Sequence, residues 1–306
     1  MNTKKNTFIT LVITLIATLT GCNKEFDLDH VVAPSQKIVV FGFISPSHDT
    51  IKVEVTRLAH LNEIDSCKNL DRRKLIIPNA IVKIRNEKLT KQLHFNANTG
   101  NYYLPAKEMP IISGSEYSLE VHAEGFKSIH AETKVPLKDT IIMHPEYIEK
   151  LSLYDYNMNF RFNDIPGSKN FYHLFASNDC GNGMGITDLH FEKDEKFQGL
   201  EMFFDTYINP NKYLHSILLT DEKIDGHTIN IKCNVSSFSG TNPNKITFFL
   251  LSTDQYYYDY HKHLMLHDPG NTFAEPRNIK SNVINGVGVF ASYNLYTKEF
   301  IFDRKD

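Results

Sequence analysis

From Lys37 onward, apolar residues alternate with polar ones in short stretches that turn residues separate. In residues 51–55 charged side chains separate the apolar positions, and residues 80–84 repeat this period of two. A period of two is typical of strands that bury one face against a second layer. The sequence therefore predicts a mostly β fold of two antiparallel, sandwich-like domains. The strands that we expect lie at residues 38–41, 51–55, 80–84, 100–104, 117–121, 158–162, 171–175, 228–232 and 245–250.

The length of the chain suggests where these strands divide. A chain of 306 residues is long enough for two domains of the usual size, about 100–200 residues each. Thr133-Lys134-Val135-Pro136 closes the first series of strands, so we place a β-sandwich at residues 37–136 and a second β-rich domain at residues 137–306. Hydrophobic residues make up 41% of the chain and charged residues 23%, which excludes a largely disordered protein.

One stretch of the second domain has helical spacing instead. Tyr257, Tyr260 and Leu264 recur at three- and four-residue intervals, which predicts a short α-helix at residues 253–267. Ser252 and Gln255 form a capping box at its start, and Asp268-Pro269-Gly270 ends it. Four tyrosines crowd this helix, and they either pack into a core or contact a partner or a sugar. They are Tyr256, Tyr257, Tyr258 and Tyr260.

The first 21 residues have the pattern of a signal peptide. Lys4 and Lys5 precede an apolar run at residues 8–19, and Leu19-Thr20-Gly21-Cys22 follows as a lipoprotein box. Twelve residues of helix span about 18 Å, too short for a hydrocarbon core of about 30 Å. We therefore expect cleavage before Cys22 and attachment of lipid to its thiol. The alternative is a plain secretory signal in which the cysteine is incidental.

Residues 22–36 follow as an acidic tether. The stretch after Cys22, Asn23-Lys24-Glu25-Phe26-Asp27-Leu28-Asp29, resembles the surface-export signal of Bacteroidota lipoproteins. The alternative is a solvated spacer between the lipid and the first strand. With Cys22 lipidated, Cys67, Cys180 and Cys233 remain, so we expect at most one internal disulfide.

Charge and motifs exclude several functional classes. Against 33 Lys and Arg stand 36 Asp and Glu, so the chain has no basic excess for binding nucleic acid. It also lacks Gly-x-Ser-x-Gly, a phosphate loop, His-Glu-x-x-His and Cys-x-x-Cys. We therefore expect no enzymatic activity and no cofactor. An enzyme would need catalytic groups that the fold assembles from distant positions.

The histidines of the expected helix are the nearest approach to a metal-ligand set. His263 and His267 are four residues apart and could share one metal, and Asp259 lies four residues before His263. His261 lies two residues before His263. No carboxylate completes the pattern, so we expect an exposed polar helix face and no metal site.

Residues 37–130 carry a family resemblance. Val40-x-Gly42, Asn79-Ala80-x-Val82-x-Ile84, Thr99-Gly100-x-Tyr102 and Tyr117-x-Leu119-x-Val121-x-Ala123-x-Gly125-Phe126 resemble the carboxypeptidase regulatory-like and transthyretin-like sandwiches. Gly100 and Gly125 lie where turns need a positive φ. The resemblance implies a domain of the non-catalytic kind.

Almost the whole chain carries a second resemblance. The lipoprotein box, Asn79-Ala80, Asn170-Phe171-Tyr172 and the segment from Phe273 to Phe290 resemble a Bacteroidota lipoprotein family, the domain-of-unknown-function family numbered 4249. The resemblance implies an outer-membrane lipoprotein, often encoded beside TonB-dependent transporters. We therefore expect a non-catalytic accessory protein of nutrient uptake, lipid-anchored in the outer membrane and exposed on the cell surface. The alternatives are a structural surface protein, such as an adhesin or fimbrial component, and a position on the periplasmic face.

The segment before the last strands combines a turn signal with a candidate surface. Asn285-Gly286 predicts a type I′ hairpin turn, and Gly288 suggests a bulge or a close backbone approach to the helix. The alternative is a ligand or partner contact. The candidate surface thus comprises the four tyrosines together with Glu275, Asn282, Asn285 and Gly286.

Overall fold

A computed structural model describes most of the chain after residue 36. The described residues are 37–59, 71–152, 155–179, 184–192, 203–204, 216–222, 225–237, 245–266 and 279–302. The expected signal peptide, Cys22, the tether and Glu275 lie outside these ranges, as do Cys67, Cys180 and His267. Gln36–Asp306 form one compact unit, and the boundary that we expect after residue 136 stays a prediction.

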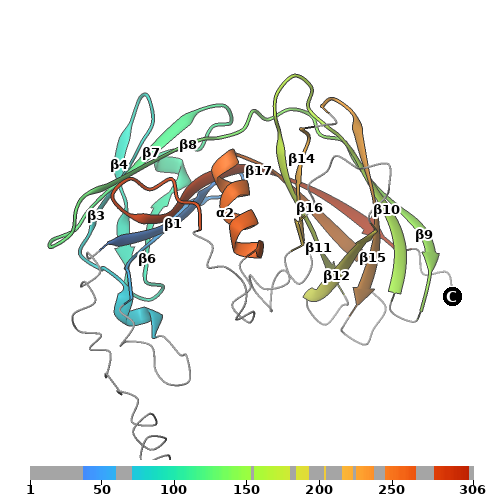
Figure 1. Ribbon diagram of the computed structural model, residues 1–306, viewed down its shortest axis with the longest axis horizontal. Coiled ribbons are helices and arrows are strands. Elements are labelled where there is room, and N and C mark those ends of the chain that lie inside the picture. Colours follow the sequence, from blue (N-terminus) through green and yellow to red (C-terminus); the bar gives the residue numbers. More distant parts are fainter. Residues whose placement is uncertain are drawn as a thin grey trace, which may run out of the picture. The chain divides into compact units, whose positions relative to one another are not determined.

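The described strands form two sheets (Figure 1). Four antiparallel strands make the smaller sheet, in the order β4, β3, β7, β8. The larger sheet has thirteen strands, of which eleven follow one another as β5, β6, β2, β1, β17, β16, β11, β12, β15, β10 and β9. β14 pairs with β11 and with β13 beside this path.

The smaller sheet consists of β3 (Ile81–Arg85), β4 (Thr90–Gln92), β7 (Glu116–His122) and β8 (Ile129–Lys134). The larger sheet consists of β1 (Ile38–Ile44), β2 (Thr50–Arg57), β5 (His94–Asn96), β6 (Asn101–Pro105), β9 (Met143–Lys150), β10 (Asp155–Asn163), β11 (Phe171–Asp179), β12 (Met184–Glu192), β13 (Phe203–Phe204), β14 (Ile217–Thr220), β15 (Thr228–Ser237), β16 (Lys245–Thr253) and β17 (Val287–Ile301). Three helices are described: the 3₁₀ helices η3 (Arg72–Leu75) and η4 (Ala106–Glu108), and the α-helix α2 (Gln255–Leu266).

The mostly β fold and the helix position confirm the sequence predictions. Each of the nine expected strand stretches overlaps an observed strand, and the expected helix at residues 253–267 corresponds to α2. Gly100 and Gly125 have φ values of 73° and 81°, as their turn positions require. Alternation of side chains across a half-buried strand is a local property, so the sequence pattern finds these nine of the seventeen described strands.

The smaller sheet packs against β5, β6, β2, β1 and the first part of β17. We call this pair of layers the first sandwich. Its core takes alternate residues from both layers, such as Val53 on β2 and Leu119 on β7. Phe290, near the start of β17, is also fully buried in this core, more than 150 residues after the last strand of the smaller sheet. The last strand of the chain therefore completes the first sandwich.

Strand β17 is shared along its length between two sets of strands (Figure 1). Its first residues pair in parallel with β1, from Val39 opposite Val287 to Ile44 opposite Ser292. Its remaining residues pair antiparallel with β16, ending with Lys245 opposite Ile301. One continuous strand thus makes backbone hydrogen bonds to the first strand of the sheet and to the strand that precedes α2.

The two faces of β11 serve two further cores. Tyr172 and Leu174 point into a core that β9, β10, β14, β15 and β16 surround. Phe171 lies on the opposite face, in the core that α2 covers. Tyr257, Tyr258 and Tyr260 of α2 pack there, while residues of β1 and β17 also contribute.

The start of α2 differs from the capping box that the sequence suggests. Ser252 lies within β16 and is buried, so it does not cap the helix. The side chain of Asp254 takes this role: its Oδ1 accepts a hydrogen bond of 2.7 Å from the backbone N–H of Tyr257. The strand continues one residue beyond the expected cap because Ser252 and Thr253 pair with β11 and β17.

The hairpin expected at Asn285-Gly286 is wrong. Asn285 has a positive φ of 62°, but Gly286 is not among the residues with positive φ, so the turn is not type I′. The chain before it does not pair with β17. Ile284 instead forms an isolated bridge with His130 of β8. Tertiary pairing with β1 and β8 replaces the local hairpin that the two residues favour.

Gly288 makes the close backbone approach that the sequence suggests, but to another element. Its φ is 111°, and a Cβ atom added there would lie 2.0 Å from the carbonyl oxygen of Val40. The neighbour is therefore β1 and not the helix. A glycine is required because any side chain would collide with the backbone of the paired strand.

Candidate functional site

The structure separates the four candidate tyrosines into one exposed and three buried residues. Tyr256, in the first turn of α2, has 43% of its surface exposed. Tyr257, Tyr258 and Tyr260 are buried between α2 and the larger sheet. Of the four, only Tyr256 can offer its ring to a ligand or partner without a change in structure.

Each buried tyrosine has a specific neighbour in the core. The hydroxyl of Tyr257 lies 2.8 Å from Nδ1 of His173. The ring of Tyr258 packs on Phe171 with centroids 4.9 Å apart, and Tyr260 meets Phe41 edge to face. Burial raises the pKa of Tyr260 to about 12. These three rings fix α2 on the sheet.

Asn282 and Asn285 hold the segment before β17 against the edge of β8. The side chain of Asn282 donates to the carbonyl of Phe290 at 2.7 Å and accepts from its N–H at 3.0 Å, as a paired strand would. It also donates to the carbonyl of Glu132, and Asn285 donates to that of Ser128. Both asparagines therefore close a sheet edge with their side chains.

Gly286 occupies a crowded position beside these asparagines. A Cβ atom added there would lie 2.8 Å from the carbonyl oxygen of Ile38 and 2.9 Å from side-chain atoms of Ile129 and Val283. The structure thus places it against the core of the first sandwich.

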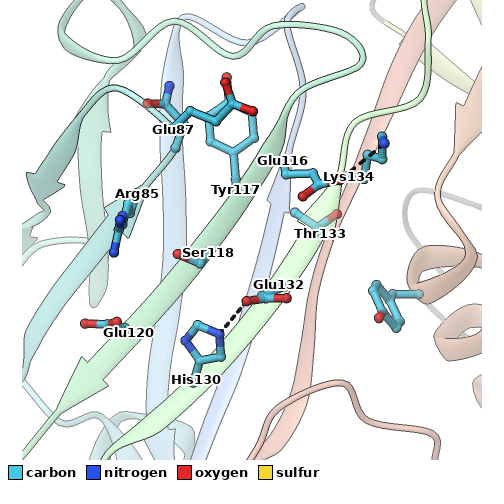
Figure 2. A pocket seen from close by; sticks show the side chains of 12 residues that line it. Arg85, Glu87, Glu116, Tyr117, Ser118, Glu120, His130, Glu132, Thr133 and Lys134 are labelled. Atoms are coloured by element: carbon cyan, nitrogen blue, oxygen red, sulfur yellow. Dashed lines mark hydrogen bonds and ion pairs between the residues drawn. The ribbon is translucent and has the colours of Figure 1, made fainter.

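An open groove of about 470 Å³ lies on the outer face of the smaller sheet and reaches Tyr256 of α2. Figure 2 shows the side chains of β3, β7 and β8 standing on this face. A second hollow of about 400 Å³ continues along the same face and shares Glu120 and His130 with the first. We call the first hollow the groove; its polar lining includes Arg85, Glu87, Glu116, Glu120, Glu132 and Lys134.

The groove combines charges of both signs. Lys134 Nζ lies 3.2 Å from Glu116 Oε1, and His130 Nε2 lies 2.9 Å from Glu132 Oε1 (Figure 2). Glu87 and Glu120 add carboxylates, and Arg85 adds a guanidinium group. Hydrogen-bond donors, acceptors and one exposed aromatic ring therefore surround the groove, which suits a polar ligand or a polar partner surface.

A buried carboxylate behind the groove sets the position of Tyr256. Asp254 caps α2 and accepts hydrogen bonds from the hydroxyl of Thr133 on β8, and from the N–H of Ser292 on β17 at 3.1 Å. Thr133 also lines the groove. Burial raises the pKa of Asp254 to about 6, although these hydrogen bonds lower it. The carboxylate thus joins the smaller sheet, β17 and the helix at one point.

The structure also contains a cluster of three aspartates that the sequence analysis did not identify. Asp164, Asp221 and Asp225 bring carboxylate oxygens within 4.8 Å of one another, a donor set that would suit a hard cation. The loop backbone and side chains already contact them: Asp164 accepts from Tyr172 Oη at 2.5 Å and from Gly226 N at 2.8 Å. These contacts tie the loop after β10 to the loop after β14. The four-residue spacing of Asp221 and Asp225 was the only signal in the sequence.

Among the described residues, no helix has both the length and the apolar character needed to cross a membrane.

Three solved structures show weak likenesses to this chain. The full-length major pilin SpaD of Corynebacterium diphtheriae has a TM-score of 0.26 at 9% identity, with 71% of this chain and 60% of the pilin covered. For AvmM, which catalyses macrocyclization in alchivemycin A biosynthesis, the TM-score is 0.22 at 9% identity, with 60% and 95% covered. For the collagen adhesin of S. aureus it is 0.23 at 9% identity, with 87% and 95% covered. At these scores the likenesses bear on neither fold nor function.

The comparison with protein families, by contrast, identifies the family of the chain. No curated protein matches the sequence. One family model, described as "Domain of unknown function (DUF4249)", matches residues 23–299, which is nearly all of the chain after the expected lipoprotein box. The protein is therefore a member of the DUF4249 family.

Proposed function

We propose that the protein is a lipid-anchored, surface-exposed protein of the outer membrane that serves a TonB-dependent nutrient-uptake system as a non-catalytic accessory component. The lipoprotein box at Leu19-Thr20-Gly21-Cys22 supports the lipid anchor. The family resemblance supports the link with the transporter. The observation that carries the binding role is the groove beside Tyr256.

The groove has the properties of a contact surface. Apart from Glu87, its charged groups belong to three adjacent strands of the smaller sheet, so backbone pairing fixes their spacing before binding. Tyr256 adds an aromatic ring that loses little conformational entropy on contact, and tyrosine is enriched among residues that dominate binding energy. Asp254 holds the start of α2 and so positions this ring.

A specific observation supports a second candidate, a structural surface protein. Strand β9 is the last strand at one end of the larger sheet, and most of its side chains are exposed. Ile148 and Leu151 are exposed at and just beyond its end. An edge strand with exposed apolar residues can add a strand from another subunit, as polymer-forming proteins do.

Affinity purification of the tagged full-length protein from its native membrane tests both candidates. We expect a TonB-dependent transporter to co-purify with the wild type and to be lost with Tyr256→Ala. Tyr147→Ala is the matched control, because Tyr147 is 41% exposed but lies on β9. Retention of the transporter by Tyr256→Ala would contradict the groove as the contact. Self-polymers that Ile148→Lys abolishes, without a transporter, would favour the structural candidate.

A further inference from the structure

The interface between α2 and the larger sheet is aromatic, yet it contains two histidines. His173 lies in the middle of β11 and has only 4% of its surface exposed. His261 lies on α2, one turn after Tyr257, and is half-buried. The centroids of the two imidazole rings are 5.7 Å apart. The expectation of an exposed helix face is therefore wrong for His261, which faces the sheet.

Each ring has one buried nitrogen with no hydrogen-bond partner. These atoms are Nε2 of His173 and Nδ1 of His261. Buried polar atoms in native structures are almost always paired, because the lost contact with water is otherwise uncompensated. Each of these two nitrogens, on neighbouring rings, therefore lacks a partner that a bound group would supply.

Burial favours the neutral form of both imidazoles. Burial lowers the pKa of His261 to about 3. Burial also lowers the pKa of His173 well below its usual value, and the nearby His261 lowers it further. A neutral imidazole keeps one nitrogen lone pair, which is the form that binds a metal.

The spacing of the rings fits one shared metal ion. With nitrogen–metal distances of about 2.0–2.1 Å, the ring centroids lie about 5 Å apart for a tetrahedral angle and about 6.4 Å apart for a linear one. The observed 5.7 Å falls between these limits.

Tyr257 has the contacts of a residue that orients the two ligands. Its hydroxyl lies 2.8 Å from Nδ1 of His173, and this contact fixes the ring and leaves Nε2 for another partner. Its ring lies against His261, with centroids 4.2 Å apart. One tyrosine thus holds both imidazoles in place.

The surroundings determine which ion would fit. Phe43, Phe175 and Tyr260 place their rings within 5.6 Å of one or other imidazole. Among the described residues, the one cluster of three candidate metal ligands is Asp164, Asp221 and Asp225, so it adds no carboxylate ligand to the two histidines. Zinc would require further ligands, and calcium or magnesium would require oxygen donors. A monovalent ion is less costly to bury than a divalent one, and imidazole is a copper ligand, although Cu(I) prefers sulfur where sulfur is present.

We propose that His173 and His261 form a buried two-imidazole site for Cu(I), with Tyr257 as the positioning residue. The site is independent of the groove and of the binding function proposed above.

Anaerobic competition between the full-length protein in detergent and a chromophoric Cu(I) chelator tests this site. We expect the wild type to hold one Cu(I) that His173→Phe or His261→Phe abolishes. Tyr257→Phe should weaken binding by about 10–100-fold, the usual effect of losing a contact that orients a ligand. His263→Gln is the matched control on the same helix, because its Nδ1 contacts the backbone carbonyl of Asp259. It should leave the affinity unchanged.

X-ray absorption of the loaded wild type gives a second measurement that needs no variant. Two nitrogen donors around copper would support the site, and sulfur donors would overturn it. Absence of Cu(I) binding by the wild type, or equal weakening by His261→Phe and His263→Gln, would also overturn it. Circular dichroism establishes that each variant is folded. Should the phenylalanine variants not fold, the absorption spectrum and Tyr257→Phe decide the question.

Discussion

Gly42 on β1 and Phe290 on β17 lie in direct contact, so that a Cβ atom added to Gly42 would lie 3.0 Å from Cδ2 of Phe290. The two residues come from opposite ends of the described chain, and their strands pair in parallel. The absence of a side chain at residue 42 gives the phenyl ring its place in the core of the first sandwich. The stability of this sandwich therefore depends on the C-terminal strand.

Replacement of Phe290 by alanine tests this dependence. The ring is completely buried, so we expect Phe290→Ala to lower the free energy of unfolding by about 3–5 kcal/mol. Urea denaturation measures the change. Ile301→Ala, on the exposed end of the same strand, should change it by less than about 0.5 kcal/mol. Equal effects of the two substitutions would contradict the role of Phe290.

Two glycines with positive φ should respond differently to alanine. Gly167→Ala meets no atom within 4 Å, so it should cost only the backbone strain of about 1–3 kcal/mol. Gly288→Ala should cost more, because its Cβ would lie 2.0 Å from the carbonyl oxygen of Val40. Thermal melting of both variants provides the comparison. A smaller loss for Gly288→Ala than for Gly167→Ala would mean that β1 and β17 do not approach so closely.

The raised pKa of Asp254 predicts a dependence of stability on pH. The folded protein binds this proton more tightly than the unfolded chain, with a pKa of about 6 against 3.8. The contribution of Asp254 to stability is therefore fully present below about pH 4 and is lost as the pH rises through about 6. We expect the stability difference between the wild type and Asp254→Asn to shrink over this range in urea titrations. A difference that grows with pH would disprove the assignment.

Lipid attachment at Cys22 predicts a change in partitioning. Each buried methylene contributes about 0.8 kcal/mol, and stable anchoring needs more than one acyl chain. Cys22→Ala should remain uncleaved or leave the membrane fraction, as detergent-phase partitioning and apparent size would show. Cys67→Ala serves as the control. An alanine variant at Cys22 with normal size and partitioning would exclude lipidation there.

Local patterns were sufficient for several features. Alternation at residues 51–55 locates β2, and the spacing of Tyr257, Tyr260 and Leu264 locates α2, because burial of one face imposes these periods. Gly100 was identifiable because its turn needs a positive φ. The sequence did not distinguish Tyr256 from its neighbours, since helical spacing alone does not say which side of a crowded turn faces the sheet.

Other features depend on contacts between residues that are far apart in the sequence. Asn285-Gly286 favours a hairpin locally, but β1 and β8 supply stronger partners for the flanking residues. His173 and His261 are 88 positions apart, and the sequence gives no sign that they meet. The same holds for Thr133 and Asp254, whose contact fixes the start of α2.

The sequence by itself determined the mostly β class, the positions of nine of the seventeen described strands and the single described α-helix, because period and turn chemistry act within a few residues. Only the tertiary structure decided that β17 lies between β1 and β16, that Tyr256 alone of the four tyrosines is exposed, and that two histidines share one buried interface. The period of a strand defines which of its faces is buried but not which strand lies beside it. That choice depends on packing and backbone pairing between segments far apart in the chain.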